Sequence, residues 1–233
     1  MPVALRVVIL GMIISLLVGC QQGKVRSFNV KNLAKSDIDM VTDAHLQELS
    51  KLARELLVKM YKLNPRELAK APAGMTVDKR ISQLFSMPRI IQFAELGKPY
   101  GTTAVPVAFN PTFSGDRVFA LMVGIAGMIH GSYNYQDEFF MLDEIDQQKL
   151  YHCARNLESI AWQLHHRRDA HGELLLVSNS INSVTGETNL STERLLAKMI
   201  SLQDMMARIL SDKNNRAINK VLHGVASTTL LPI

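Results

Sequence analysis

Apolar residues recur at alternating steps of three and four along much of this chain. The first such stripe begins after the pair Thr42-Asp43, which is typical of a helix start, and it stops at Asn64-Pro65. Its members are Leu46, Leu49, Ala53, Leu56, Met60 and Leu63. This spacing places the six side chains on one face of a helix. Because proline cannot continue a helix that precedes it, the pattern predicts one buried helix that ends at this point.

Shorter elements follow this first stripe. The sequence predicts a brief helical piece from Pro65 to Lys70 and a further helix from Thr76 to about Phe85. Residues 97–115 then contain three glycines and three prolines. Such a long irregular stretch inside a domain is usually functional or packed as a unit of its own.

The segment Val118–Ile129 is apolar at every position, and Ser114 and Asp116 precede it as capping residues. A helix that is apolar all round lies in the centre of a core. Twelve residues are too few to cross a bilayer, which needs about 20. Three glycines fall near one face of the predicted helix: Gly124, Gly127 and Gly131. They predict the close approach of a neighbouring helix, and the alternative is the small-residue spacing of paired membrane helices.

Two long helices are expected in the remainder of the chain. Asp143 is the predicted cap of the first helix, and Gly172 closes the turn after it. The apolar face of this helix consists of Leu150, Cys153, Leu157, Ile160 and Leu164. The helix ends in the cationic residues His165, His166, Arg167 and Arg168. Residues 174–177 form an apolar run that is either a strand or an extended loop. The second helix begins at Ser191 and Glu193 and carries Leu195, Met199, Leu202, Met206 and Ile209. Its seam is interrupted at residues 213–215 and resumes at Ile218, Val221, Leu222 and Val225.

The apolar tail, residues 230–233, is expected to tuck into the domain or a partner. No segment repeats another, so a solenoid is unsupported. Together these patterns predict an all-α fold, a single compact multi-helix domain built around a central apolar helix.

The N-terminus carries the clearest signal in the chain. Arg6 precedes an apolar run over residues 7–18, and Leu17, Val18 and Gly19 lead into Cys20. This order is typical of a bacterial lipoprotein signal, and the motif resembles the lipobox of signal peptidase II. The resemblance implies cleavage before Cys20 and acylation of that cysteine. An uncleaved anchor is the alternative, but residues 7–19 are too few to span a hydrocarbon core.

The signal divides the chain into a signal peptide (1–19), a lipidated cysteine with a flexible tether (20–41) and a helical periplasmic domain (42–233). A multiply acylated cysteine is enough for stable membrane anchoring. Gln21 follows the cysteine where an aspartate would favour retention in the inner membrane. We therefore expect lipid anchoring to the outer membrane, with the domain on its periplasmic face. Fully extended, a tether of about 20 residues reaches roughly 70 Å.

The chain is basic, with 26 Lys and Arg against 21 Asp and Glu. Removal of Arg6 leaves 25 minus 21, or +4. Because the signal directs the chain away from nucleic acid, anionic lipid headgroups or an acidic protein partner fit this charge better, and surface solvation explains it most simply. Of the two cysteines, Cys153 has no intramolecular partner once Cys20 is acylated, so it is expected to be a buried, inert thiol.

Enzymatic motifs are sparse. Glu158-Ser159 resembles the Glu-Ser pair of lytic transglycosylases, and residues 132–134 resemble their Ala-Tyr-Asn segment. That segment should follow the catalytic glutamate, however, and here it precedes it. The sequence also lacks Gly-x-Ser-x-Gly and Ser-x-x-Lys. A cell-wall lytic enzyme using Glu158 is thus the third hypothesis, and no catalytic residue is assigned.

Metal and cofactor signals are equally weak. No two of the seven histidines have the i, i+4 spacing of a zinc protease, and only His165, His166 and His171 could converge. The acidic stretch 137–146 lacks the ligand spacing of a calcium loop. We expect neither a metal nor a cofactor.

The densest aromatic cluster follows the central apolar helix and consists of Tyr133, Tyr135, Phe139 and Phe140. Closure of the core is one interpretation of it. A surface for a partner or a ligand is the other.

Three segments carry a family resemblance: Gly115-Asp-Arg-Val-Phe-Ala-Leu-Met, Asp146-Gln-Gln-Lys-Leu-Tyr and Leu195-Leu-Ala-Lys-Met-Ile-Ser-Leu-Gln-Asp. With them the chain resembles an uncharacterised family of proteobacterial outer-membrane lipoproteins, from about Thr42 to the C-terminus. The resemblance implies no activity and no site residues. By layout alone, the chain is also similar to accessory subunits of secretion-system cores in the outer membrane.

These observations favour a lipid-anchored, non-enzymatic structural or assembly subunit of a bacterial envelope complex that acts through protein contacts. The alternative is a periplasmic carrier of a lipid or other hydrophobic ligand, with its cavity under the glycine-bearing helix and the aromatic cluster. The sequence predicts a membrane contact through Cys20 and an envelope protein partner, and it leaves the oligomeric state open.

Overall fold

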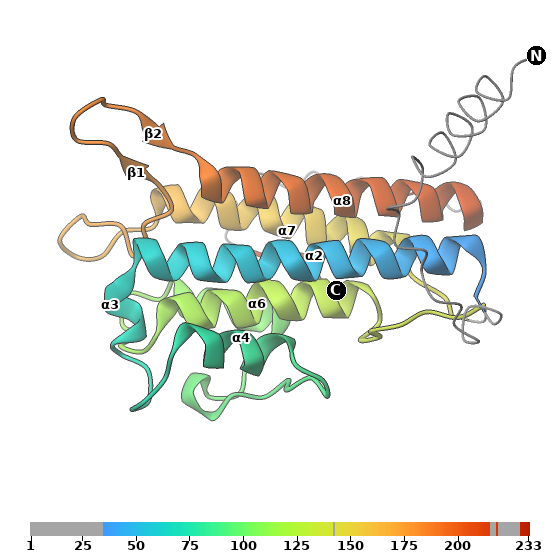
Figure 1. Ribbon diagram of the computed structural model, residues 1–233, viewed down its shortest axis with the longest axis horizontal. Helices are drawn as coiled ribbons and strands as arrows, with labels where there is room; N and C mark the ends of the chain where they lie inside the picture. Colours follow the sequence, from blue (N-terminus) through green and yellow to red (C-terminus); the bar gives the residue numbers. More distant parts are fainter. Residues whose placement is uncertain (1–34, 142, 215–217, 219–228) are drawn as a thin grey trace, which may run out of the picture. The chain divides into compact units, whose positions relative to one another are not determined.

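The computed structural model describes residues 35–141, 143–214, 218 and 229–233, and most of them are helical, as predicted (Figure 1). The helices of the described part are α2 (Asp37–Leu63), α3 (Pro65–Leu68), α4 (Val77–Phe85), α5 (Val105–Ala108), α6 (Arg117–Ser132), α7 (Gln147–His166) and α8 (Ser191–Asn214). Two 3-10 turns, η2 (Ala94–Leu96) and η3 (Gly101–Thr103), and two short strands, β1 (Ser180–Ile181) and β2 (Thr188–Asn189), complete them. The described residues from Lys35 onward form one compact unit. None of the described helices is long and apolar enough to cross a membrane.

Helix α2 begins before the predicted position at Thr42. Its first residue is Asp37, because the carboxylate of Asp39 accepts hydrogen bonds from the backbone nitrogen of Ser36 at 2.7 Å and from the Ser36 hydroxyl at 2.6 Å. This capping arrangement satisfies donors at the helix start. The segment 37–41, which the sequence placed in the tether, therefore belongs to the first helix. The end of α2 at Leu63 agrees with the prediction.

Helix α6 is the centre of the core. Every residue from Arg117 to Ser132 is buried, and the helix packs against α2, α5 and α7. The carboxylate of Asp116 caps it by accepting a hydrogen bond from the backbone nitrogen of Phe119 at 2.9 Å. The prediction of a central apolar helix is confirmed.

The glycines of α6 do face a close neighbour, but it is not a long helix. A Cβ atom on Gly124 would lie 2.4 Å from the Val105 side chain, and one on Gly127 would lie 2.4 Å from the backbone nitrogen of Gly101. Turn η3 and the start of α5 therefore fill this face of α6. They occupy the position where the carrier hypothesis placed its cavity.

The cap of α7 lies three residues after the predicted one. Asp146 caps it by accepting a hydrogen bond from the backbone nitrogen of Gln148 at 2.8 Å. The prediction that Asp143 is the cap was wrong, because the Asp143 carboxylate is used by the preceding loop, where it accepts from the backbone nitrogen of Phe140 at 2.8 Å. Gly172 closes the turn after α7 with a φ of 81°.

Residues 174–177 form an extended segment with one bridge pair, between Arg168 and Leu174. Strands β1 and β2 form a small antiparallel hairpin before α8, with Ser180 paired to Asn189, and the sequence did not predict it. Helix α8 begins at Ser191, as predicted. Of the residues expected to resume its seam, only Ile218 lies within the described part.

The C-terminal tail packs onto the domain, as expected. The side-chain amide of Asn156 on α7 donates to the carbonyl oxygen of Leu231 at 2.9 Å and accepts from its backbone nitrogen at 2.7 Å. Leu230 and Ile233 lie against the core. Asn156 is itself fully buried, so the two hydrogen bonds fix the tail to the middle of α7.

Candidate binding groove between α2 and α8

Helices α2 and α8 lie side by side and run in opposite directions, and two surface hollows occur along this pair (Figure 1). We call them together the α2–α8 groove. The larger, of about 560 Å³, is lined by Glu48, Leu52, Arg194, Ala197, Lys198, Ser201 and Leu202. The smaller, of about 380 Å³, is lined by Arg54, Glu55, Val58, Lys59, Lys62 and Leu195. Both helices contribute to each hollow.

The groove is a product of helical spacing. On α2, the positions 48, 52, 55, 59 and 62 follow one another in steps of three and four, so they share one face. On α8, Leu195 and Leu202 are one heptad apart, pack against the core and line the hollows together with α2 residues. Apolar side chains thus occupy the floor, while the long charged side chains stand at its edges.

The charge of the groove is strongly unbalanced. Its lining holds five cationic side chains, from three lysines and two arginines, against the carboxylates of Glu48 and Glu55. The difference is +3. The Glu48 carboxylate is in addition 3.2 Å from the ammonium group of Lys51. An apolar floor within a cationic edge suits an anionic ligand with an apolar face.

Helix α8 is fixed in place by contacts behind the groove. Gln203 is fully buried and donates from its amide to the hydroxyl of Ser132 on α6 at 3.0 Å. Arg155 on α7 forms an ion pair with Asp204 at 2.6 Å. His45 on α2 is half-buried, and this burial lowers the pKa of its imidazole. These contacts hold α8 against α6 and α7.

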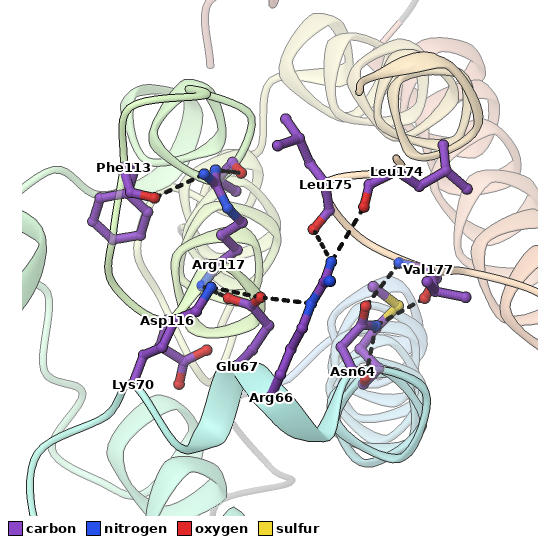
Figure 2. A network of polar contacts seen from close by, with 12 residues as sticks. Asn64, Arg66, Glu67, Lys70, Phe113, Asp116, Arg117, Leu174, Leu175 and Val177 are labelled. Atoms are coloured by element: carbon purple, nitrogen blue, oxygen red, sulfur yellow. Dashed lines mark hydrogen bonds and ion pairs between the residues drawn. The ribbon is translucent and has the colours of Figure 1, made fainter. Parts of the chain in front are cut away.

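A polar network at the α3 end of the bundle fixes the segment that leads into α8 (Figure 2). The Asn64 side chain donates to the carbonyl oxygen of Val177 at 2.8 Å and accepts from its backbone nitrogen at 2.7 Å. The Arg66 guanidinium donates to the carbonyl oxygen of Leu174 at 3.2 Å. These bonds connect the turn after α2 to the extended segment that precedes the hairpin and α8.

The same network fixes the start of α6. The Glu67 carboxylate, almost completely buried, accepts from the backbone nitrogen of Arg117 at 3.0 Å and from the Lys70 ammonium group at 2.8 Å (Figure 2). The Arg117 guanidinium donates to the carbonyl oxygens of Ala108, Asn110, Pro111 and Phe113. A carboxylate at a helix N-terminus is favourable, and the arginine closes the loop before α6. Burial lowers the pKa of Arg117.

Arg80 forms a second buried ionic network. Its guanidinium donates to both carboxylate oxygens of Glu95, at 2.6 and 2.7 Å, and contacts Asp116 at 3.2 Å. It also lies over the ring of Phe119, 3.6 Å from the centroid. The Tyr61 hydroxyl donates to the Asp116 carboxylate at 2.7 Å, and burial raises the pKa of Asp116. This network joins α2, α4, η2 and the start of α6.

A third polar cluster surrounds His130 at the end of α6. The hydroxyl of Tyr100 is 3.2 Å from His130 Nδ1, and His130 Nε2 is 3.9 Å from the Asp137 carboxylate. The other oxygen of Asp137 accepts from Arg89 Nε at 2.5 Å. Burial, reinforced by the charge of Arg89, lowers the pKa of His130. Burial raises the pKa of Tyr100 to about 12.

The predicted aromatic cluster is divided between the core and the surface. Tyr133 and Phe139 are fully buried, with ring centroids 5.8 Å apart, so they close the core. Tyr135 is 57% exposed and packs edge-on against the His130 ring. Phe140 is half-buried beside the ammonium group of Lys35. Only Tyr135 and Phe140 can contribute to a surface.

Other predicted residues are placed as follows. The Glu158 carboxylate forms an ion pair with Arg155 at 3.0 Å, and burial raises its pKa. Cys153 is completely buried, and burial raises the pKa of its thiol to about 12, as expected of an inert cysteine. The His165 imidazole lies 2.8 Å from Glu193, whereas His166 stacks on Trp162. Cys20 and the residues before it, Leu17, Val18 and Gly19, lie outside the described residues.

Among the residues that the structure describes, no three His, Cys, Asp or Glu side chains are arranged to hold a metal ion. Sequence reasoning missed the groove because its two walls are far apart in the chain. The regular spacing of Glu48, Glu55, Lys59 and Lys62 was the available signal. Comparison with known proteins gave no match among family models, curated proteins or solved structures.

Proposed function

We propose that this chain is a lipid-anchored structural or assembly subunit of a bacterial envelope complex. In this proposal, acylation of Cys20 holds the chain on the periplasmic face of the outer membrane, and the helical body acts through protein contacts rather than catalysis. The observation that carries the proposal is the α2–α8 groove, with its apolar floor and its surplus of +3.

The shape and the charge of the groove indicate which class of partner it binds. Its two hollows follow successive turns of α2, so an elongated ligand with side chains at regular intervals fits them better than a compact one. An amphipathic helix has this form, because its anchors recur at i, i+3, i+4 and i+7. The cationic edge adds a requirement for acidic residues beside these anchors. We therefore propose that the groove binds an acidic amphipathic helix of another envelope protein.

The buried networks support a docking role for this face. Contacts from Asn64, Gln203 and Arg155 hold α8 and the segment before it in one position. Because these contacts hold the helices that form the groove, binding does not require the helices to rearrange. The hollows lie on the solvent side of the helix pair, where Arg194, Ala197 and Lys198 are exposed.

In-cell photocrosslinking tests the proposal. A photoreactive amino acid is placed at Ala197, within the groove, in the full-length chain expressed in its natural host. We expect one main adduct with an envelope protein, and we expect mass spectrometry to locate it in an acidic segment with apolar residues at helical spacing. The same probe at Thr112, which is exposed on the loop before α6, is the positional control and should give no such adduct.

Charge reversal supplies the second arm. The double variant Lys59→Glu and Lys198→Glu should abolish the adduct, because it places two negative charges beside an acidic ligand. Lys79→Glu with Lys98→Glu changes the net charge equally but lies outside the groove, so this variant should retain the adduct. Equal loss in both double variants, or adducts only with basic or uncharged segments, would contradict the proposed function.

A further inference from the structure

The segment between α4 and η2, residues 86–93, presents apolar side chains to solvent. Met87 is 58% exposed, Ile90 is 50% exposed and Ile91 is 48% exposed. They are among the most exposed large hydrophobic residues of the described chain, and they occur within five consecutive positions. A cluster of this kind on a protein surface commonly marks an interaction site.

The backbone of this segment is held at both ends and in the middle. Phe85 and Phe93 are buried in the core, and the Phe93 ring packs edge-on against Phe119 with centroids 5.0 Å apart. In the middle, Arg89 is paired with Asp137 on the loop after α6. These contacts tie the segment to the body of the domain, while Met87, Ile90 and Ile91 are exposed on it. We call residues 86–93 the 86–93 loop.

The surroundings of the 86–93 loop resemble a membrane interface in composition. The loop contains no acidic residue, and the carboxylate of Asp137 beside it is paired with Arg89. Tyr135, two residues from Asp137, is 57% exposed, and exposed tyrosines are favoured at the level of lipid headgroups. Projecting aliphatic side chains with such neighbours suit the soft surface of a bilayer.

The length of chain between Cys20 and the described body indicates which surface the 86–93 loop contacts. Only fourteen residues, 21–34, separate Cys20 from the described body. Their maximum reach is about 50 Å, so an acylated chain keeps the body permanently within that distance of lipid. Because the chain is tethered to the bilayer, the effective concentration of lipid near an exposed apolar group of the body is high. We infer that the 86–93 loop inserts Met87, Ile90 and Ile91 into the phospholipid surface to which the chain is anchored.

Insertion would also orient the proposed groove. Helix α4 packs against α2 and α6, whereas α8 packs against α2 and α7, and the two helices lie on opposite sides of α2 in Figure 1. With the α4 side on lipid, α8 would lie on the side of α2 that is remote from the bilayer. This inference rests on the acylation of Cys20 within the proposed function, but it does not depend on what the groove binds.

Fluorescence quenching by lipid tests the inference with the full acylated chain. Ile91→Cys is labelled with an environment-sensitive fluorophore, since Cys20 carries lipid and Cys153 is buried, and the protein is reconstituted in vesicles of phosphatidylethanolamine and phosphatidylglycerol. Val184→Cys, 91% exposed on the hairpin between β1 and β2, is the matched control. Lipids brominated on their acyl chains should quench the probe at 91 at least about threefold more than the probe at 184, because bromine quenches only at short range within the hydrocarbon.

Replacement of the two other exposed apolar side chains of the loop provides the second test. Met87→Ser with Ile90→Ser should abolish the extra quenching at position 91, and the chain should still fold because neither side chain belongs to the buried core. Equal quenching at 91 and 184 would overturn the inference. So would a photoreactive amino acid at Ile91 that forms protein adducts instead of lipid adducts in cells. Mass spectrometry of the mature N-terminus detects a failure of acylation separately, and crosslinking at Ala197 detects a failure of the groove.

Discussion

Gly127 on α6 and Gly101 in turn η3 are in backbone contact, since a Cβ atom on Gly127 would lie 2.4 Å from the Gly101 nitrogen and 2.7 Å from its Cα atom. Because backbone atoms cannot swing aside as a side-chain end can, alanine at this position forces the turn away from the helix. We expect Gly127→Ala to destabilise the fold by about 1–3 kcal/mol, despite the higher helix propensity of alanine. Urea unfolding of the purified chain measures this change.

Gly131, on the same helix, is the control for this substitution. A Cβ atom there would meet the Ile233 side chain at 3.1 Å and the Tyr135 ring, both of which can shift. Gly131→Ala should therefore change the free energy of unfolding by less than about 1 kcal/mol. Equal effects of the two substitutions would mean that the backbone contact is not a constraint.

The buried network around Arg80 predicts a larger effect. Arg80→Gln removes the cation that compensates Glu95 and Asp116, and breaking a buried ion pair typically costs about 3–5 kcal/mol. Lys51→Gln breaks the exposed pair with Glu48 and should cost less than about 1 kcal/mol. Thermal and urea unfolding of the two variants should differ accordingly. Similar costs would contradict the assignment of Arg80 as the central ion of the network.

His130 predicts a pH dependence of stability. Because its pKa is lowered in the folded state, the unfolded chain takes up this proton more readily than the folded chain. The resulting stability is fully present above the ordinary histidine pKa of about 6.5, and it is lost as the pH falls from there through the folded pKa. His130→Gln should reduce the slope of unfolding free energy against pH below about 6.5. His45, whose pKa is also lowered, contributes equally to the slope of the parent and of the His130→Gln variant. An unchanged slope in the variant would therefore exclude a role for His130.

Cys153 predicts a chemical test of the mature chain. Its thiol is completely buried with a pKa raised to about 12, so it should not react with a maleimide in the folded protein at neutral pH. With Cys20 acylated, the chain should show no reactive thiol until denaturant is added, and one thereafter. Two reactive thiols after denaturation would show that Cys20 carries no lipid, whereas rapid labelling of the folded chain that peptide mapping locates at Cys153 would show that this thiol is accessible.

Much of the helical fold follows from local sequence signals. Pro65, the caps Thr76 and Asp116, and the apolar run of α6 act within a few residues, and the structure places each as expected. The start of α2 was missed although Ser36 and Asp39 have the spacing of a capping box. Asp143 and Asp146 are both candidates for the cap of α7. Phe140 and Gln136 donate hydrogen bonds to the Asp143 carboxylate, so Asp146 is left to cap the helix.

The candidate groove could not be predicted in this way, because it depends on pairing between distant helices. Lys59 and Lys198 each belong to an ordinary polar face in sequence, and only the packing of α2 against α8 brings the two faces together. The same is true of the ion pairs of Arg80 and Arg89, whose partners are set by loops. Local spacing determines which face of a helix is polar, but tertiary packing determines what that face adjoins.

A charge exchange between the two proteins tests the groove most directly. Crosslinking at Ala197 first locates the acidic helix of the partner. The affinity between the two purified proteins is then measured with Lys59→Glu and Lys198→Glu in this chain, with lysines replacing the facing acidic residues of the partner, and with both changes together. Each single-sided change should weaken binding at least about tenfold, which is about 1.4 kcal/mol, and the combined exchange should restore most of the affinity. If the combined exchange binds no better than either single-sided change, the α2–α8 groove is not the docking site.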